Sequence, residues 1–237
     1  RGRLFDPCAG EGKAASSLGN ALNCETWGVE LSPERAGKAQ NVMDKVYQAP
    51  WQACVLSDES ISWLYLNPPY DFDRFEGQKR LEWDFLKTTS SKLMRGGLLT
   101  YIIPQKILGM IEVARLLAGH YEAITVYRFP DGLYEKFKQV VVLAYKRKLY
   151  QLPTDKEILS LQSLASIELE PIQSAVEPIY QLLSAPSRGA NGKPVVFKRT
   201  DWEPEEVVEA TKEAGVQKTS DWLDLIHPTR GLAQLSQ

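Results

Sequence analysis

Short apolar runs alternate with segments of helical periodicity over most of the chain. The runs typical of buried strands are residues 3–5, 26–30, 63–66, 98–103, 124–129 and 140–145. Helical periodicity marks residues 13–22, 80–94 and 107–118, and Arg95-Gly96-Gly97 is expected to end the second of these helices. This alternation predicts an α/β fold with a doubly wound, mainly parallel sheet, whose last two strands form a hairpin at one edge.

The run at residues 63–66 stops at Asn67-Pro68-Pro69-Tyr70. Two prolines remove two backbone donors, so the strand cannot continue and a stiff loop follows. Open α/β sheets bind their ligands at the carboxyl ends of strands. Asn67 offers a side-chain carbonyl as acceptor, and Tyr70 offers a flat ring. The loop therefore suits a planar group that carries an –NH2.

A glycine loop lies near the start of the chain, between the first predicted strand and a helix. Its sequence is Asp6-Pro7-Cys8-Ala9-Gly10-Glu11-Gly12. Gly10 and Gly12 allow a ligand to approach the backbone and permit a positive φ. The strand–turn–helix context makes the loop a candidate cofactor site.

A second acid stands at the end of the next predicted strand, where Glu30 follows Asp6 by 24 positions. This is near the spacing at which α/β nucleotide sites place an acid against ribose hydroxyls. A carboxylate can accept both hydroxyl protons in a fork. Ser32 is expected to cap the following helix, with Pro33 at its first position.

These motifs resemble motifs IV and I of class I amino-methyltransferases that depend on S-adenosylmethionine (SAM), best known from the N6-adenine DNA methyltransferases. Glutamine methyltransferases share the N-P-P-Y motif. The order, glycine loop before N-P-P-Y, matches the γ arrangement, and the resemblance covers residues 1–148. It implies SAM as cofactor and a methyltransferase domain over those residues, followed by a C-terminal annex at residues 149–237 that shapes substrate choice.

The resemblance also assigns roles to residues of this chain. It places the cofactor at Asp6, Pro7, Cys8, Ala9, Gly10, Gly12, Glu30, Leu31, Trp51 and Asn67. It makes Asn67, Pro68, Pro69 and Tyr70 catalytic, with the Asn67 side chain and the Pro68 carbonyl accepting the amine hydrogens and Tyr70 stacking on a base that has left the duplex. Phe137 is either a second stacking wall for that base or an edge-strand core residue.

The chain departs from the family in two places. Family members usually carry an acid after the third strand, which holds the cofactor adenine, but residues 46–52 contain none. Trp51 is expected to stack on the adenine there, and Gln48 to accept from its amino group. The family also has a segment upstream of the glycine loop; its absence here implies a fragment or an element supplied from elsewhere.

Composition adds limits on compartment and partners. The chain has 237 residues with 43% hydrophobic content and a net charge of -2, so contact with DNA or RNA must come from a local patch. No apolar run is long enough to span a bilayer and no leader is evident. The three cysteines lack metal or disulfide spacing, so a cytoplasmic protein without a metal is expected. The sequence does not indicate the oligomeric state.

The last third offers fewer signals. A short strand is predicted at residues 195–199 and a helix from Asp201. A phosphate-binding stripe or ordinary solvated charge would account for the basic residues Lys146, Arg147, Lys148, Arg188, Lys193, Lys198 and Arg199. His120 and His227 have no partners at ligand spacing.

DNA is the expected substrate, with RNA less favoured. One alternative keeps the methyltransferase and changes its substrate to RNA or a protein glutamine amide. A second alternative is a non-catalytic nucleic-acid-binding module on a degenerate methyltransferase fold, suggested by the missing acid and the missing upstream segment. Analysis of the methylated product distinguishes DNA from RNA or protein glutamine as the substrate. A measurement of SAM binding tests whether the chain is a non-catalytic module.

Overall fold

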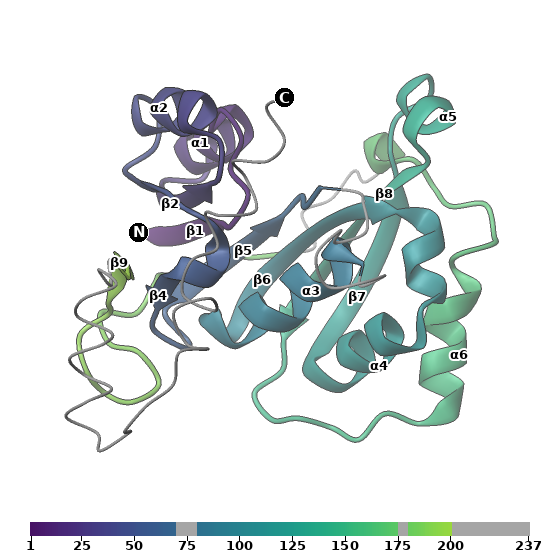
Figure 1. The fold of residues 1–237 in the computed structure, drawn as a ribbon. Coiled ribbons are helices and arrows are strands. Elements are labelled where there is room, and N and C mark those ends of the chain that lie inside the picture. The colour runs from purple at the N-terminus through teal and green to yellow at the C-terminus, as the bar shows by residue number, and fades with distance from the viewer. Residues whose placement is uncertain (70–79, 175–179, 201–237) are drawn as a thin grey trace, which may run out of the picture. The chain divides into compact units, whose positions relative to one another are not determined.

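The structure is a computed structural model that describes residues 1–69, 80–174 and 180–200. Within these residues, seven strands form one sheet in the order β3-β2-β1-β5-β6-β8-β7 (Figure 1). The strands are β1 (Gly2–Asp6), β2 (Cys24–Glu30), β3 (Lys45–Gln48), β5 (Ile61–Leu66), β6 (Leu93–Pro104), β7 (Tyr121–Arg128) and β8 (Gln139–Lys146). β8 is antiparallel to β6 and β7, and the other neighbouring strands are parallel. The predicted edge hairpin is therefore confirmed.

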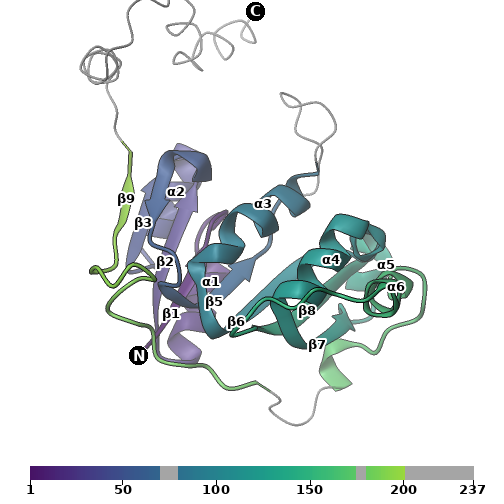
Figure 2. The ribbon, with the colours of Figure 1, turned by 90° about the horizontal axis from the view of Figure 1, so that it is seen from below.

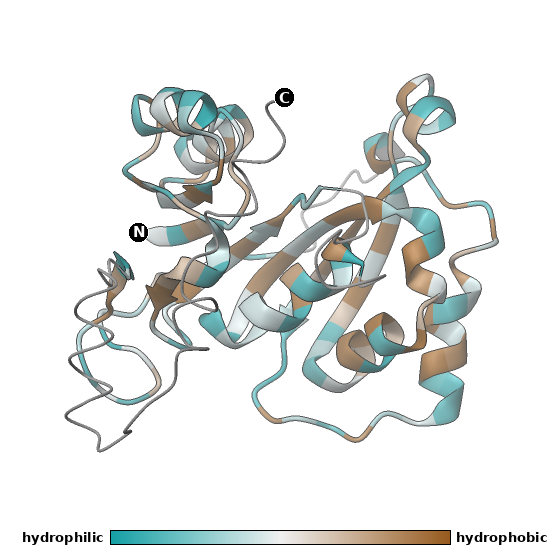
Figure 3. Cartoon of the chain, viewed as in Figure 1, coloured by the Kyte–Doolittle hydropathy of each residue, from teal (hydrophilic) through white to brown (hydrophobic). Residues whose placement is uncertain are grey.

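Helices cover both faces of the sheet. Successive strand residues point to opposite sides, and here both sets include apolar side chains that pack against helices. Leu4 and Trp63 pack on one face with α1 (Lys13–Ala21) and α2 (Pro33–Gln40). Phe5 and Leu64 pack on the other with α3 (Leu81–Thr89) and α4 (Ile111–His120). Figure 2 shows this layering, and Figure 3 shows how apolar residues gather on the strands. The predicted doubly wound α/β fold is confirmed.

The predicted helix at residues 80–94 is wrong at its carboxyl end. α3 ends at Thr89, and β6 already begins at Leu93. Leu93 pairs with Ile61 and is fully buried, so the sheet requires it as a strand residue. The residues that were expected to end the helix instead form a bulge, after which Leu98 pairs with Trp63. Gly96 takes a φ of 73° in this bulge.

One further helix boundary differs from the sequence prediction. The helix expected at residues 107–118 begins only at Ile111, after a 3-10 turn at Gln105–Gly109. The predicted cap of α2 is confirmed, since the Ser32 Oγ accepts from the Arg35 N–H and Pro33 opens the helix. No helix among the described residues has the length and apolar content to cross a bilayer.

The described residues between 149 and 199 pack on the sheet domain, and Arg1–Arg199 form one compact unit. α6 (Asp155–Ser163) contacts α4, and β9 (Phe197–Arg199) pairs antiparallel with the short β4 (Cys54–Leu56). The predicted late strand is therefore confirmed, with its start at Phe197. The division at residue 148 stays a prediction, and the helix expected from Asp201 lies outside the described residues.

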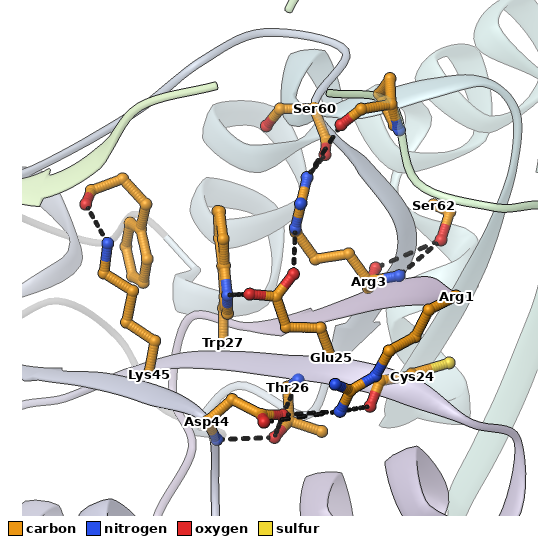
Figure 4. A network of polar contacts seen from close by, with 12 residues as sticks. Arg1, Arg3, Cys24, Glu25, Thr26, Trp27, Asp44, Lys45, Ser60 and Ser62 are labelled. Carbon is orange, nitrogen blue, oxygen red and sulfur yellow. Dashed lines mark hydrogen bonds and ion pairs between the residues drawn. The ribbon is translucent and has the colours of Figure 1, made fainter. Parts of the chain in front are cut away.

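Aromatic and polar contacts hold β9 against the first strands. The Phe197 ring stacks on Trp27 with centroids 5.2 Å apart. Lys45 Nζ donates to the Phe197 carbonyl at 2.8 Å. Beside them, Glu25 accepts from Arg3 Nε at 3.0 Å and from Trp27 Nε1 at 2.8 Å (Figure 4). A late segment of the chain thus packs against β2 and β3, on the sheet face that carries Phe5 and Trp27.

Candidate functional site

The loops that follow β1, β2, β3 and β5 enclose a cavity of about 410 Å³ at the carboxyl edge of the sheet. Residues named from the sequence that line it are Pro7, Cys8, Gly10, Glu30, Leu31, Trp51, Asn67 and Pro69. The sequence did not single out Arg35, Ala49, Pro50, Gln52, Leu81 and Phe85, which also line it. Leu81 and Phe85 stand four residues apart on α3, a spacing that places both on one helix face. The structure therefore gathers both motifs around one space.

The two glycines of the first loop have different roles. Gly10 has a φ of 56°, and a side chain there would meet no atom within 4 Å, so the backbone is open to the cavity. Gly12 has a φ of 77°, and a Cβ there would stand 3.0 Å from Ala39 Cα and Met43 Sδ. Gly12 is thus required by packing against α2, and it does not line the cavity.

Asp6 lies behind this loop, not on the cavity wall. Its side chain is buried, and Oδ1 accepts from the Cys8 N–H at 3.0 Å. Burial raises the pKa of Asp6 to about 7, and the nearby Glu30 carboxylate adds to the rise. Ala9 also stays off the wall, since its N–H donates to the Val29 carbonyl at 2.9 Å.

Glu30 ties the first two loops together. Its carboxylate accepts from the Gly10 N–H at 2.8 Å and from the Ser32 N–H at 2.8 Å. Arg35 donates to it from Nε at 3.1 Å and from a terminal nitrogen at 2.8 Å. The Glu30 side chain is only 5% exposed, so these bonds form in a setting that water screens weakly. The acid at the end of β2 is therefore held in one orientation.

The rigid tip after β5 meets the glycine loop directly. Leu66 ends the strand fully buried, Pro68 is buried, and Asn67 and Pro69 are exposed on the cavity wall. Burial raises the pKa of the Cys8 thiol well above its usual range, while a contact with the Asn67 backbone lowers it. The two motifs thus touch at the pair Cys8 and Asn67. Tyr70 lies outside the described residues.

Trp51 forms the wall near the end of β3. Its ring centroid lies 5.3 Å from that of Phe5, and its Nε1 donates to Thr88 Oγ1 at 3.1 Å. Gln48 does not line the cavity, and its Nε2 donates to the Leu31 carbonyl at 3.3 Å. Glu30 is the sole acid among the described lining residues, so the missing acid after β3 has no replacement in the described part of the cavity.

Phe137 ends the short helix α5 (Leu133–Phe137) in the connection between β7 and β8. Its side chain is 47% exposed, so its expectation as a core residue of an edge strand is wrong. Lys136 Nζ stands 4.9 Å from the ring. Phe137 does not line the cavity, and its role as a stacking wall stays a prediction.

The basic residues that suggested either a phosphate-binding stripe or ordinary solvated charge lie in different settings in the structure. Lys146 Nζ donates to Ser90 Oγ at 2.8 Å, and burial lowers the pKa of Lys146 to about 8. Arg147 pairs with Glu122 at 3.2 Å. Exposed members of this group are Lys148, Arg188, Lys193, Lys198 and Arg199. Among the described residues, no group of three or more His, Cys, Asp or Glu is suited to hold a metal ion.

The strand order, the antiparallel hairpin at one edge and the cavity at the carboxyl ends of β1 and β5 define an α/β protein with the class I methyltransferase fold. A model of the uncharacterised methyltransferase family DUF6094 matches residues 1–182, and the chain belongs to this family. SAM is the cofactor that this membership indicates. A comparison with curated proteins finds no match.

Several solved structures are similar to this chain at low sequence identity. A predicted O-methyltransferase from Agrobacterium tumefaciens has 19% identity and a TM-score of 0.45, over 70% of this chain and 91% of that one. An RNA methyltransferase from Salinibacter ruber, in complex with S-adenosyl-L-homocysteine, has 13% identity and a TM-score of 0.40, over 65% and 85%. TrmN from Thermus thermophilus has 19% identity and a TM-score of 0.45, over 61% and 44%.

Proposed function

We propose that this chain transfers the methyl group of SAM to the exocyclic N6 amine of adenine in DNA. One observation supports this most directly: the Asn67 tip and the Gly10 loop line the same cavity, and Cys8 contacts the Asn67 backbone. A methyl donor over the glycine loop and an amine at the tip would then share one cavity. Such positioning supplies much of the catalysis of a direct transfer.

The cavity residues fit the cofactor. The open backbone at Gly10 leaves room for its amino-acid end, and the buried Asp6 supports that loop from behind by accepting from the Cys8 N–H. Glu30 presents a buried carboxylate for the ribose, and Trp51 offers an aromatic wall for the adenine. When bound, SAM supplies a methyl group on a sulfonium that is already activated.

The tip prepares the target amine. Its lone pair is delocalised into the adenine ring, so the amine is a poor nucleophile. The Asn67 side-chain carbonyl and the Pro68 carbonyl accept its two hydrogens, which favours a pyramidal nitrogen and stabilises the positive charge that develops there. The new N–C bond forms as the S–C bond breaks, and the surplus proton of the nitrogen then leaves to solvent.

Tyr70 and Phe137 are the two aromatic residues that we propose to stack on the target base. A target adenine must leave the duplex to reach the tip, and aromatic rings stack on such bases. Phe137 carries the accessible ring that this requires, with Lys136 beside it. Tyr70 follows Pro69 directly in the sequence.

Product analysis tests the proposal. The whole chain is incubated with SAM carrying a deuterated methyl group and with unmethylated duplex DNA, and the nucleosides are then examined by mass spectrometry. We expect labelled N6-methyladenine. Label found only in RNA, or only on glutamine of added protein, would replace DNA by that substrate, and no transfer to any of them would refute the enzyme.

An Asn67→Ala variant probes the role of the tip. Loss of a preorganised acceptor lowers kcat by about 100- to 1,000-fold, as for a single oxyanion-hole donor. Its affinity for S-adenosylhomocysteine falls by a much smaller factor than kcat, because Asn67 is one of several cofactor residues and the glycine loop and Glu30 are intact. Asn41→Ala, at the end of α2 and away from the cavity, is the matched control.

A further inference from the structure

The two carboxylate oxygens of Glu30 accept different numbers of hydrogen bonds. Oε1 accepts from the Ser32 N–H and from two nitrogens of Arg35. Oε2 accepts from the Gly10 N–H alone among the described residues. A carboxylate has about four acceptor positions, two on each oxygen. Oε1 is therefore saturated, and only Oε2 retains a position for a ligand.

The Arg35 guanidinium, which also lines the cavity, has N–H donors that the bonds to Glu30 do not occupy. A guanidinium carries five N–H groups in a planar fork, and the two bonds to Glu30 use two of its nitrogens. The Arg35 side chain is 56% exposed and lines the cavity next to Glu30 and Leu31. It thus presents hydrogen-bond donors to the space that the ribose would occupy.

The local structure fixes Arg35 in this position. Ser32 caps α2 by accepting from the Arg35 N–H at 3.4 Å, which sets Arg35 in the first helical turn. Ala49 N–H donates to the Glu30 carbonyl at 3.0 Å and closes the other side. Lys38, one turn later on α2, pairs with Glu11 and Glu34 and does not line the cavity.

We propose that Arg35 is a specificity residue for the ribose of the cofactor. It holds Glu30 by Oε1, so that Oε2 accepts one ribose hydroxyl, and its free N–H groups donate to the oxygen of the other. The site then reads the ribose with one acceptor and one donor. This replaces the two-hydroxyl carboxylate fork expected from the sequence, and it rests on the proposed SAM site.

Calorimetry with two ligands tests the proposal. S-adenosylhomocysteine carries the adenosine and the amino-acid end, and 5′-methylthioadenosine carries the adenosine, with its ribose, but no amino-acid end. We expect Arg35→Ala to weaken both by the same factor, about 10- to 100-fold, as for loss of charge-assisted hydrogen bonds. Arg35→Lys keeps the charge but loses the fork, so it recovers only part of the affinity. Lys38→Ala removes a cation from the same helix and leaves both affinities unchanged.

Deoxy ligands supply a readout that a purely structural role would not change. For the parent chain, the 2′-deoxy and the 3′-deoxy forms of 5′-methylthioadenosine both bind more weakly. In Arg35→Ala, removal of one of the two hydroxyls no longer weakens binding, because the arginine that contacted this hydroxyl is gone. Removal of the other hydroxyl, which donates to Glu30 Oε2, still weakens binding.

Three results would overturn the inference: equal affinities for the parent and Arg35→Ala, a loss for S-adenosylhomocysteine but none for 5′-methylthioadenosine, or two unchanged deoxy penalties. None of these bears on the substrate, since no DNA is present. Conversely, failure to methylate DNA would leave the ribose site intact. A parent chain that binds neither ligand refutes the cofactor site and the role of Arg35 together.

Discussion

The carboxyl edge of the sheet has two sides that are built differently. On the cavity side, backbone bonds between neighbouring strand–helix units position the loops that follow β1, β2 and β3. Gly10 and Ser32 both donate from the backbone to the Glu30 carboxylate, and the Ala49 N–H donates to the Glu30 carbonyl. Each of these groups stands within about one strand–helix unit of the next.

On the hairpin side, where β6, β8 and β7 meet, the closing contacts come from far along the chain. Gln105, directly after β6, donates from its amide to the Leu164 carbonyl at 2.7 Å and to the Ile167 carbonyl at 2.8 Å. α5 projects from this side and has no buried residue. The loops after β1, β2 and β3 are thus positioned by bonds between neighbouring strand–helix units, whereas the hairpin side depends on a later segment of the chain that packs there.

The largest effect is expected where a late segment supports the cavity side. Phe197 is buried against Trp27 and Phe5, and Phe5 in turn contacts Trp51 on the cavity wall. Phe197→Ala leaves a hole in this aromatic cluster and lowers the free energy of unfolding by about 3–5 kcal/mol. Urea titration measures the loss. Val196→Ala, at an exposed neighbouring position, serves as control, and equal losses in both variants would mean that β9 is not anchored by Phe197.

The same contrast explains what the sequence could and could not predict. A few adjacent residues determine each of three features: the loop at Gly10, the cap at Ser32 and the tip at Asn67. They could be predicted because turn chemistry and proline geometry act locally. Seven of the ten predicted cofactor residues line the cavity, and Asp6, Ala9 and Gly12 do not, because burial and packing claim them.

Other features depend on tertiary contacts. Arg35 reaches the cavity only because Glu30 binds it, and its position three residues after the cap was the one available signal. The stacking of Phe197 on Trp27 joins segments with no shared sequence pattern. Leu93 is apolar with helical spacing, yet its pairing with Ile61 decides for a strand. Tertiary burial overrides local propensity at such positions.

Asp6 offers a pH test of the cavity side. Its pKa is about 7 in the folded chain against 3.8 for the free group, chiefly because of burial. The folded state then binds this proton more tightly than the unfolded state, so the stability that the group contributes is complete below about pH 4 and is lost as the pH rises to 7. Asp6→Asn removes this dependence while keeping an acceptor for the Cys8 N–H.

We therefore expect the variant to gain stability relative to the parent by up to about 1.4 kcal/mol per pH unit between pH 5 and 7. Chemical unfolding of both chains across that range measures the difference. Asp44 and Asp58, whose pKa values are lowered, act in the opposite direction, but they are present in both chains and cancel. A difference that does not vary with pH would contradict a buried proton on Asp6.

Phe137 tests the hairpin side. Because its ring is exposed, Phe137→Ala changes the free energy of unfolding by less than about 0.5 kcal/mol. If the ring stacks on the target base, the KM for DNA rises by about 5- to 100-fold. Phe137→Tyr retains the ring and the KM. Leu133→Ala, equally exposed on α5, is the control, and a matching rise in that variant would show a general effect of α5 instead of stacking.

The smallest effect separates backbone from side chain on the cavity side. The Ser32 hydroxyl accepts from the Arg35 N–H at 3.4 Å, a long bond, and Pro33 already favours the helical start, so Ser32→Ala costs only about 0.5–1 kcal/mol of unfolding free energy. The bond that matters to Glu30 comes from the Ser32 backbone and survives the change. Affinity for S-adenosylhomocysteine should therefore stay within about two-fold of the parent by calorimetry. A loss as large as that of Arg35→Ala would mean that the cap, and not the guanidinium, positions the acid.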